Sequence, residues 1–354
     1  MIGSAAIVTI VDFNNFGNRL QNFALQEMVR RAGVAEVRTI VNSPQLHDAF
    51  GNGSYLRLKA ERIGLWMTAL QIARSLRRSS ADAGELSRIE NAVIPVRMFE
   101  GSLEQASSQF DAFIVGSDQV WNPLYRFASP VDFLSFAPPG RRIAYAASFG
   151  HASLPSWLRD TYASGLTGID AISVREPEGA LIVRELTGRE VPVVLDPTLL
   201  AGPEMWHSLV PPKAGPAAGA GLVFGVGLSS QDQNVAEEST RARGLAVQHL
   251  PPGSGLSPLA LVEGISAAAF VATNSFHAFA FAVMYRKPVL VLPREGMGGR
   301  FEAVLDVMGV DKTACRAGRP FLVEPCDWEE LEARLEPARA ASWHFLITAL
   351  GAVQ

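Results

Sequence analysis

The stretch FVATNSFHAFAFAVMYRKPVLV, residues 270–291, decides the fold class of this chain. It predicts a short apolar strand that ends near Thr273, a helix that runs to about Tyr285, and a second apolar strand after it. Asn274 or Ser275 can cap that helix, because a side-chain oxygen there accepts a hydrogen bond from a backbone amide of the first turn. A buried strand, a helix and another buried strand form the repeating unit of a parallel α/β sheet.

The same alternation of apolar runs and helical patterns extends outward from this unit over most of the chain. Near-continuous apolar runs are typical of strands covered by helices on both faces of a sheet. The N-terminal runs are AAIVTIV, EVRTIV, DAFIVGSD, RRIAYAASFG, AISVRE and VPVVLDPTLL; the C-terminal runs are GLVFGVGLS, AVQHLP, AAAFVATNS, PVLVLPRE and PFLVEP. We therefore expect an α/β fold of the doubly wound type.

Residues 202–221, which are rich in Pro, Gly and Ala, separate the two groups of runs and predict a linker. A chain of 354 residues is also longer than a typical single domain. We expect two Rossmann-like domains that face each other across a cleft, over residues 1–203 and 217–335. Residues 336–354 belong to a C-terminal helix that we expect to cross back to the first domain.

Composition excludes several classes of protein. Hydrophobic residues make up 48% of the chain, which is enough for packed cores and argues against disorder. A formal net charge of −4 lacks the basic excess of a nucleic-acid-binding protein. Cys315 and Cys326 form neither a C-x-x-C pair nor a disulfide framework, so we expect a reducing, cytoplasmic location.

Membrane contact is expected at one segment at most. The N-terminus predicts a first strand and not a signal peptide, and the apolar stretch 267–285 is interrupted by polar residues, so we expect no membrane span. Residues 55–78 carry six Lys or Arg among Leu, Ile, Trp and Met. Two interpretations stay open: a basic amphipathic helix on the inner face of the membrane, or an ordinary helix packed on the first domain.

His277 falls in the first turn of the predicted helix after Thr273. Ligands of open α/β sheets bind beyond the carboxyl ends of the strands, and free amides at a helix N-terminus attract anions. An imidazole at this place can transfer a proton near neutral pH. The alternative is an ordinary core histidine between Phe276 and Phe279.

The segment DAFIVGSDQVWNP, residues 111–123, gives a second candidate site at a strand end. Asp118 is a candidate acid or base, or a hydrogen-bond partner for a sugar hydroxyl. Ser117 can bind the same ligand or cap a helix, and Trp121 offers a face for a sugar ring. The alternative is a capping Asp and a packing Trp.

Arginines supply the positive charge that a phosphate or a carboxylate requires. Arg175 closes one predicted strand, and Arg300 follows a glycine-rich loop. The alternative for Arg175 is a surface ion pair with Glu176 or Glu178. The turn after the first strand adds neutral and basic groups that suit a polyhydroxyl or phosphate ligand, among them Asn18, Arg19 and Gln21.

Common cofactor and metal motifs are missing from the sequence. The first turn matches neither G-x-G-x-x-G nor a P-loop, and the chain has no H-E-x-x-H, no paired Cys and His at zinc spacing and no G-x-S-x-G. We therefore expect neither a metal nor a cofactor.

Together these segments resemble the polysaccharide pyruvyltransferase family. They occur in the family's order: NFGNRLQNFALQ (15–26), DAFIVGSDQVWNP (111–123), IAYAASFG (143–150), ISVREPEG (172–179), VVLDPTLL (193–200), TNSFHAFAFAV (273–283) and GRFEAVLDVMGV (299–310). The chain departs from the family pattern at Ala278, where Gly is usual, and at Gly299, where Ser is common. Both departures put the choice of acceptor in doubt.

The resemblance implies a glycosyltransferase-B-like fold that transfers pyruvate from phosphoenolpyruvate to two hydroxyls of a sugar as a ketal. The partners would be phosphoenolpyruvate, on the C-terminal domain, and a sugar or lipid-linked oligosaccharide, on the N-terminal domain. His277 and Arg175 match motif positions tied to the donor or to catalysis, and Arg300 matches the arginine before the late helix. Asn274 and Ser275, beside His277, are expected to help bind the substrate.

Two other functions are compatible with the same fold. One is a glycosyltransferase that uses a nucleotide sugar, although no set of residues for a base and a ribose is evident in the second domain. The other is a glycan-binding or scaffold protein without catalysis, because a fold does not fix a function.

Overall fold

The computed structural model describes residues 2–12, 15–40, 96–123, 126, 128–213, 220–251, 256–292, 298–325 and 327–353. The basic segment 55–78 and Cys326 lie outside the described residues, so the expectations for them stay predictions. None of the described helices is long and apolar enough to cross a bilayer.

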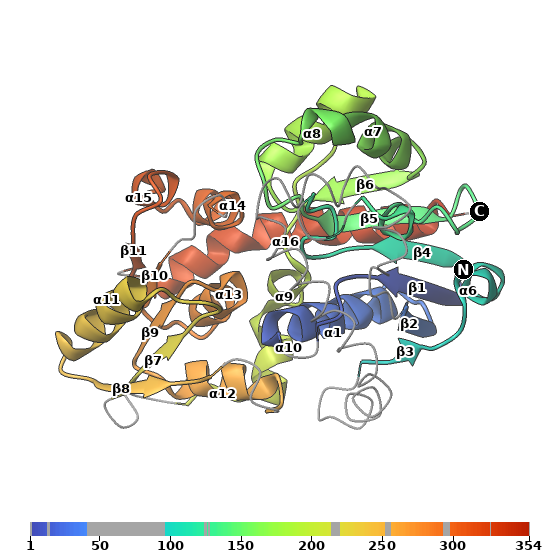
Figure 1. The fold of residues 1–354 in the computed structure, drawn as a ribbon. Helices are drawn as coiled ribbons and strands as arrows, with labels where there is room; N and C mark the ends of the chain where they lie inside the picture. Colours follow the sequence, from blue (N-terminus) through green and yellow to red (C-terminus); the bar gives the residue numbers. More distant parts are fainter. Residues whose placement is uncertain are drawn as a thin grey trace, which may run out of the picture.

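The N-terminal half builds a six-stranded parallel sheet in the order β3-β2-β1-β4-β5-β6 (Figure 1). Val, Ile and Ala fill the central strands, which are buried on both faces as the sequence predicts. The strands are β1 (Ser4–Val8), β2 (Glu36–Ile40), β3 (Met98–Phe99), β4 (Ala112–Val115), β5 (Arg142–Ala147) and β6 (Ala171–Val174). The helices are α1 (Phe16–Arg31), α6 (Leu103–Gln109), α7 (Arg159–Thr167) and α8 (Pro177–Thr187), with 3₁₀ turns η1 (Pro130–Phe133) and η2 (Ser156–Leu158).

The C-terminal half builds a second, five-stranded sheet in the order β11-β10-β9-β7-β8. Its strands are parallel except β11, which runs antiparallel to β10 at the sheet edge, so this sheet is mixed. The strands are β7 (Ala220–Phe224), β8 (Ala246–His249), β9 (Phe270–Thr273), β10 (Val289–Val291) and β11 (Phe321–Val323). The helices are α11 (Ser230–Arg241), α12 (Leu259–Ala267), α13 (Phe276–Met284), α14 (Gly299–Met308) and α15 (Thr313–Arg316). The α/β fold class is thus confirmed.

Two segments between the sheets differ from the sequence-based expectation. The run VPVVLDPTLL is no strand: Val193 makes a single bridge to Val174, and helix α9 (Pro197–Leu200) begins soon after it. The predicted linker begins as helix α10 (Gly202–Leu209). Trp206 explains this difference, because its indole is fully buried against Phe281 of α13 and must be held by ordered backbone.

The last helix, α16 (Trp328–Gly351), runs from the C-terminal sheet to the N-terminal sheet (Figure 1). Its Ser342 Oγ accepts a 2.9 Å hydrogen bond from the Leu195 backbone amide, and Arg339 Nε donates to the Leu199 carbonyl at 2.9 Å. The Phe345 ring lies 6.3 Å from that of Tyr145 on β5. Helix α16 therefore connects the two halves of the molecule.

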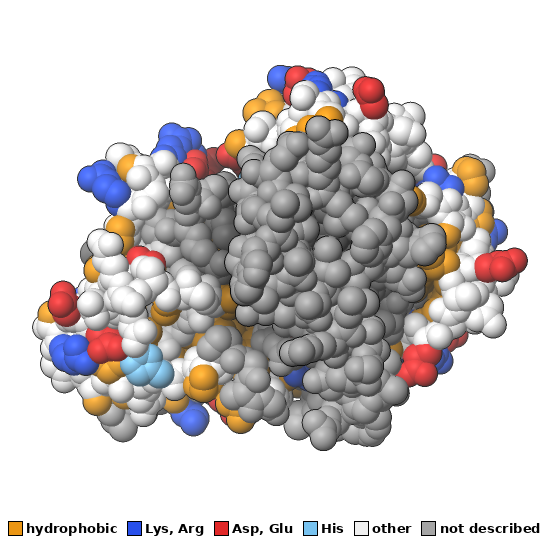
Figure 2. All heavy atoms as spheres, viewed as in Figure 1, with side chains coloured by type: hydrophobic (Ala, Val, Ile, Leu, Met, Phe, Trp, Pro, Cys, Tyr) orange, Lys and Arg blue, Asp and Glu red, His pale blue; other side chains and the backbone are white. Residues whose placement is uncertain are grey.

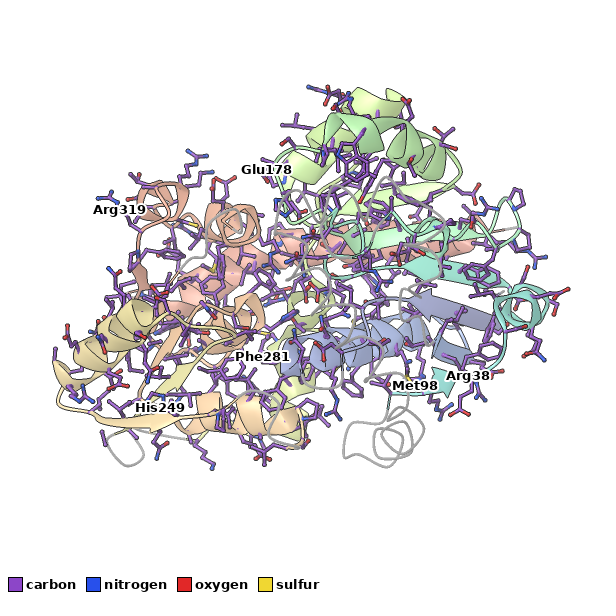
Figure 3. All side chains as sticks on the ribbon, in the orientation of Figure 1. Arg38, Met98, Glu178, His249, Phe281 and Arg319 are labelled. Carbon is purple, nitrogen blue, oxygen red and sulfur yellow. The ribbon has the colours of Figure 1, made fainter. Side chains whose placement is uncertain are left out.

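The largest apolar core is shared by both halves. It combines Leu20 and Phe23 of α1 with Phe279 and Phe281 of α13 and Leu346 of α16. Side chains fill the space around the labelled Phe281, where α13 meets α1 (Figure 3). Acidic and basic side chains lie scattered over the described part of the surface that is in view (Figure 2).

Candidate active site

The turn between β9 and α13 forms as the sequence predicts. Ser275 is the N-cap of α13, and its side chain accepts from the Ala278 amide at 3.4 Å. Asn274 exchanges two hydrogen bonds with the Val226 backbone, at 3.0 Å and 3.2 Å, and so ties this turn to the loop after β7. Both side chains therefore fix the local backbone, and His277 lies in the first turn of the helix.

The His277 imidazole is held between α13 and α1. Only 5% of the residue is exposed. A Cβ added at Gly17 would lie 2.2 Å from Nδ1 and 2.8 Å from Cγ of the ring, so only glycine at this position of α1 leaves room for the imidazole. On its other side, Nε2 lies 3.7 Å from Asp196 Oδ2, which is an ion-pair distance and longer than a hydrogen bond.

Asp196 is the centre of the polar cluster. Its Oδ2 accepts from Arg175 Nη1 at 2.7 Å and from Ser117 Oγ at 3.2 Å, while Oδ1 caps α9 by accepting from the Thr198 amide at 2.9 Å. The residue is 1% exposed. One carboxylate thus links the end of β6, the turn after β4 and the imidazole of α13.

Asp118 provides a second buried carboxylate in the turn after β4. It accepts from Arg175 Nη2 at 3.2 Å and from Asn18 Nδ2, and Arg300 Nη1 lies 3.9 Å away. The residue has a φ of 66°, a left-handed conformation that Asp tolerates better than most residues. Asp118 therefore joins residues from α1, β6 and α14.

The two carboxylates are held in the ionised state. Burial alone would raise the pKa of Asp118, but Arg175, His277 and Arg300 together bring it below its ordinary value. Burial also opposes ionisation of Asp196, yet the contact with His277, the charge of Arg175 and the Thr198 amide place its pKa far below the ordinary value. Both carboxylates are therefore ionised near neutral pH in the protein without substrate.

The two predicted arginines meet in this cluster. Arg175 is 2% exposed and pairs with the two aspartates, which corrects the alternative of a surface pair with Glu176 or Glu178. The guanidinium carbons of Arg175 and Arg300 lie 5.1 Å and 5.8 Å from the centroid of Phe276. Arg175 Nε is buried and has no hydrogen-bond partner. An acceptor atom on a ligand would satisfy it.

Other predicted residues take structural positions. Trp121 is 1% exposed, packs on Phe133 and Phe149 and donates from Nε1 to the Asp132 carbonyl at 2.9 Å. This packing leaves the indole no face for a sugar ring, in disagreement with the sequence-based expectation. Gln21 donates to Thr9 Oγ1 at 2.9 Å inside the N-terminal half. Arg19 lines a small hollow with Asp12 and Asn22, beside the cluster residue Asn18.

Sequence reasoning missed Asp196 as a functional candidate. Its local signal was present, because an Asp before Pro197 and two residues before Thr198 is a helix-capping pattern. The capping pattern explains the hydrogen bond that Asp196 Oδ1 accepts from the Thr198 amide, but it does not explain the contacts of Oδ2. The contacts of Oδ2 with Arg175 and His277 arise only from the packing of distant segments.

A cavity of about 70 Å³ adjoins the cluster between α14, α16 and the segment after β6. Arg175, Asp196 and Phe276 line it, and most of the remaining wall is apolar; it includes Val304, Val307 and Ala338. The volume exceeds the roughly 10–15 Å³ that one water molecule needs. The charged cluster is therefore next to space that a small group can enter.

Gly299, where the family commonly has Ser, lies against the side chain of Glu178. Glu178 of α8 points toward the first turn of α14 (Figure 3), and a Cβ at Gly299 would lie 2.7 Å from Glu178 Oε2. A serine at this position would require the Glu178 side chain to move. The glycine therefore permits a close approach of α8 and α14 beside Arg300.

Comparisons with known proteins agree with the resemblance. A search of curated proteins found no match. The sequence model of the family described as polysaccharide pyruvyl transferase matches residues 15–296. This match begins just before α1 and ends after β10. It includes the cluster residues Asp118, Arg175, Asp196 and His277. The chain therefore belongs to the polysaccharide pyruvyl transferase family.

Proposed function

We propose that this protein transfers pyruvate from phosphoenolpyruvate to two hydroxyls of one sugar, forming a ketal and releasing phosphate. The observation that carries the proposal is the buried cluster of two guanidinium groups, two carboxylates and one imidazole in a chain of this family. We further propose a glycosyltransferase-B-like arrangement in which the donor binds beside the C-terminal half and the sugar beside the N-terminal half.

Arg175 and Arg300 are the proposed donor ligands. Phosphoenolpyruvate carries a carboxylate and a phosphate, and planar guanidinium groups bind both kinds of oxyanion. The buried Nε of Arg175 lacks an acceptor, and an unpartnered buried donor costs about 1–3 kcal/mol. A donor oxygen at this atom would recover that free energy, which favours binding of the donor beside Arg175.

His277 and Asp118 are the proposed proton-transfer groups on the acceptor and phosphate side. Addition of a sugar hydroxyl to C2 of the donor releases the hydroxyl proton, and departure of phosphate is eased by protonation of its bridging oxygen. Asp118 is ionised and can accept the hydroxyl proton, while His277 can protonate the phosphate. A second hydroxyl of the same sugar then closes the ketal at C2.

The decisive experiment incubates the protein with phosphoenolpyruvate and a panel of sugars and lipid-linked glycan repeats. We expect phosphate release with one class of acceptor, and a product heavier than the acceptor by one pyruvate less one water. His277→Ala and Asp118→Asn should each slow phosphate release by about 10²-fold or more, as expected for loss of a proton-transfer group. Both variants releasing phosphate at the wild-type rate would contradict the proposed roles.

Ligand-dependent unfolding separates this proposal from a nucleotide-sugar glycosyltransferase. A ligand that binds only the folded chain raises its unfolding temperature. We expect a rise with phosphoenolpyruvate and none with uridine diphosphate sugars. The reverse result would favour the glycosyltransferase.

A further inference from the structure

Glu176 is a buried carboxyl group for which the proposed mechanism has no use. It follows Arg175 directly, at the carboxyl end of β6, and is 2% exposed. Its Oε1 accepts from the Phe149 amide at 2.7 Å and from the Gly150 amide at 3.3 Å. Its Oε2 is buried and has no hydrogen-bond partner. The carboxyl is thus held by one oxygen, with the other available for a proton.

The protonation of Glu176 differs from that of the two aspartates. Burial raises the pKa of Glu176 above its ordinary value, and it outweighs the lowering by Arg175, the Ser148 hydroxyl, the Phe149 amide and Arg300. Carboxyl groups whose surroundings shift their pKa values in opposite directions divide the acid and base roles of a site between them. Asp118 and Asp196 stay ionised, so Glu176 is the carboxyl that takes up a proton most readily when negative charge enters the site.

The charges of the cluster also favour Glu176 as the carboxyl that takes up a proton. Arg175 and Arg300 bring two positive charges, which Asp118 and Asp196 offset. The proton that His277 carries in the proposed mechanism adds a third positive charge, which an ionised Glu176 offsets. An incoming donor with a carboxylate and a phosphate therefore adds negative charge to a nearly neutral buried cluster. Because like charges disfavour ionisation, donor binding drives proton uptake by the nearest carboxyl that can be protonated.

We infer that Glu176 is the acid that protonates the methylene carbon of the donor, an inference that rests on the proposed function. The electron pair of the C2–C3 double bond takes the proton from Oε2, so that C3 becomes a methyl group, C2 becomes an oxocarbenium centre and Glu176 becomes a carboxylate. The first sugar hydroxyl adds to C2 and gives its proton to Asp118. Phosphate leaves with a proton from His277, and the second hydroxyl closes the ketal at C2 and gives its proton to the now neutral imidazole. The proton held by Asp118 returns to Glu176, so that the site is restored.

Calorimetry of donor binding tests this inference with phosphoenolpyruvate alone. Titration in buffers of different ionisation enthalpy gives the number of protons taken up per donor bound. We expect uptake by the wild type, and a smaller uptake by Glu176→Gln, whose side-chain carbonyl keeps the hydrogen bonds from Phe149 and Gly150. Donor affinity should change by less than about tenfold, while phosphate release with the acceptor should slow by about 10²–10⁴-fold.

Glu185→Gln is the matched control, because Glu185 lies on α8, the helix that begins directly after Glu176, but pairs with Arg159 at the surface. It should retain both proton uptake and turnover. Wild-type turnover by Glu176→Gln, or equal proton uptake in the two proteins, would overturn the role of Glu176. If Glu176→Gln does not fold, donor binding to the wild type without proton uptake would overturn it equally. No donor binding and no phosphate release by the wild type would instead refute the proposed function.

Discussion

Asp196 shows how one residue sets the electrostatics of this site. A buried carboxylate is costly unless charged and polar groups surround it, and here Arg175, Ser117 and Thr198 supply hydrogen bonds while His277 lies at ion-pair distance. The same contacts orient the guanidinium and the imidazole. Asp196 is therefore a positioning residue, and its charge stabilises the folded chain as well as the site.

At the residue scale, Asp196→Asn should lower the unfolding free energy by about 3–5 kcal/mol near pH 7, because it leaves a buried cation with one partner fewer. The folded-state pKa of Asp196 lies below its unfolded value of about 3.9, so its contribution is present above about pH 4 and is lost as the pH falls. Urea unfolding at several pH values should show the difference between variant and wild type shrinking in acid.

Glu185→Gln, which breaks the exposed pair with Arg159, is the control and should cost less than about 1 kcal/mol. A difference between Asp196→Asn and the wild type that stays constant down to low pH would contradict the assignment of the effect to the ionised carboxylate.

At the scale of elements, the site depends on how closely α1 and α13 approach each other. Glycine inside a helix is normally a weakness, since alanine is more favourable there by about 1 kcal/mol. Gly17 reverses this rule, because the His277 ring occupies the space that a Cβ would take. The absence of a side chain at Gly17, in the first turn of α1, therefore determines where the imidazole can lie.

Gly17→Ala should displace the imidazole and reduce activity more than it reduces stability. We expect a loss of about 1–3 kcal/mol in unfolding free energy from overpacking, together with a large fall in phosphate release. Gly264→Ala in α12 is the matched control, because a Cβ there would meet Leu222 at an ordinary 3.4 Å. A Gly17→Ala protein with wild-type stability and turnover would show that the approach of α1 to His277 is unimportant.

At the scale of the whole molecule, α16 and the shared core hold the two sheets together. Leu346 of α16 is fully buried in the same core as residues of both halves. Because the cluster takes Asp118, Arg175 and Asp196 from the N-terminal half and His277 and Arg300 from the C-terminal half, the geometry of the site depends on this connection.

Ser342→Ala tests the connection without removing apolar surface. It leaves the buried Leu195 amide without its acceptor, which should cost about 1–3 kcal/mol in thermal or denaturant unfolding. Ser108→Ala, at an exposed position of α6, should be close to neutral. Equal stability of the two variants would mean that the contact of α16 with the N-terminal half contributes little.

The sequence by itself determined the fold class, most strand positions and the helix that carries His277. These features follow from local rules, since Ser275 caps its own helix and most of the apolar runs form strands of the two sheets. The same rules missed the helix over Gly202–Leu209, because Trp206 needs a distant partner, Phe281, to be buried. A composition typical of linkers carries no information about that partner.

Only the tertiary structure decided which of the candidate residues meet. Local patterns place Asp118, Arg175 and His277 at the ends of strands or the starts of helices, but they do not say which ends are neighbours. Contacts such as that of Asp196 with His277 join segments far apart in the chain, and their formation depends on how both sheets pack against shared helices. Trp121 is buried in the N-terminal half for a similar reason. Its contact with the ring of Phe133, away from water, stabilises the folded chain, and the sequence alone does not reveal that contact.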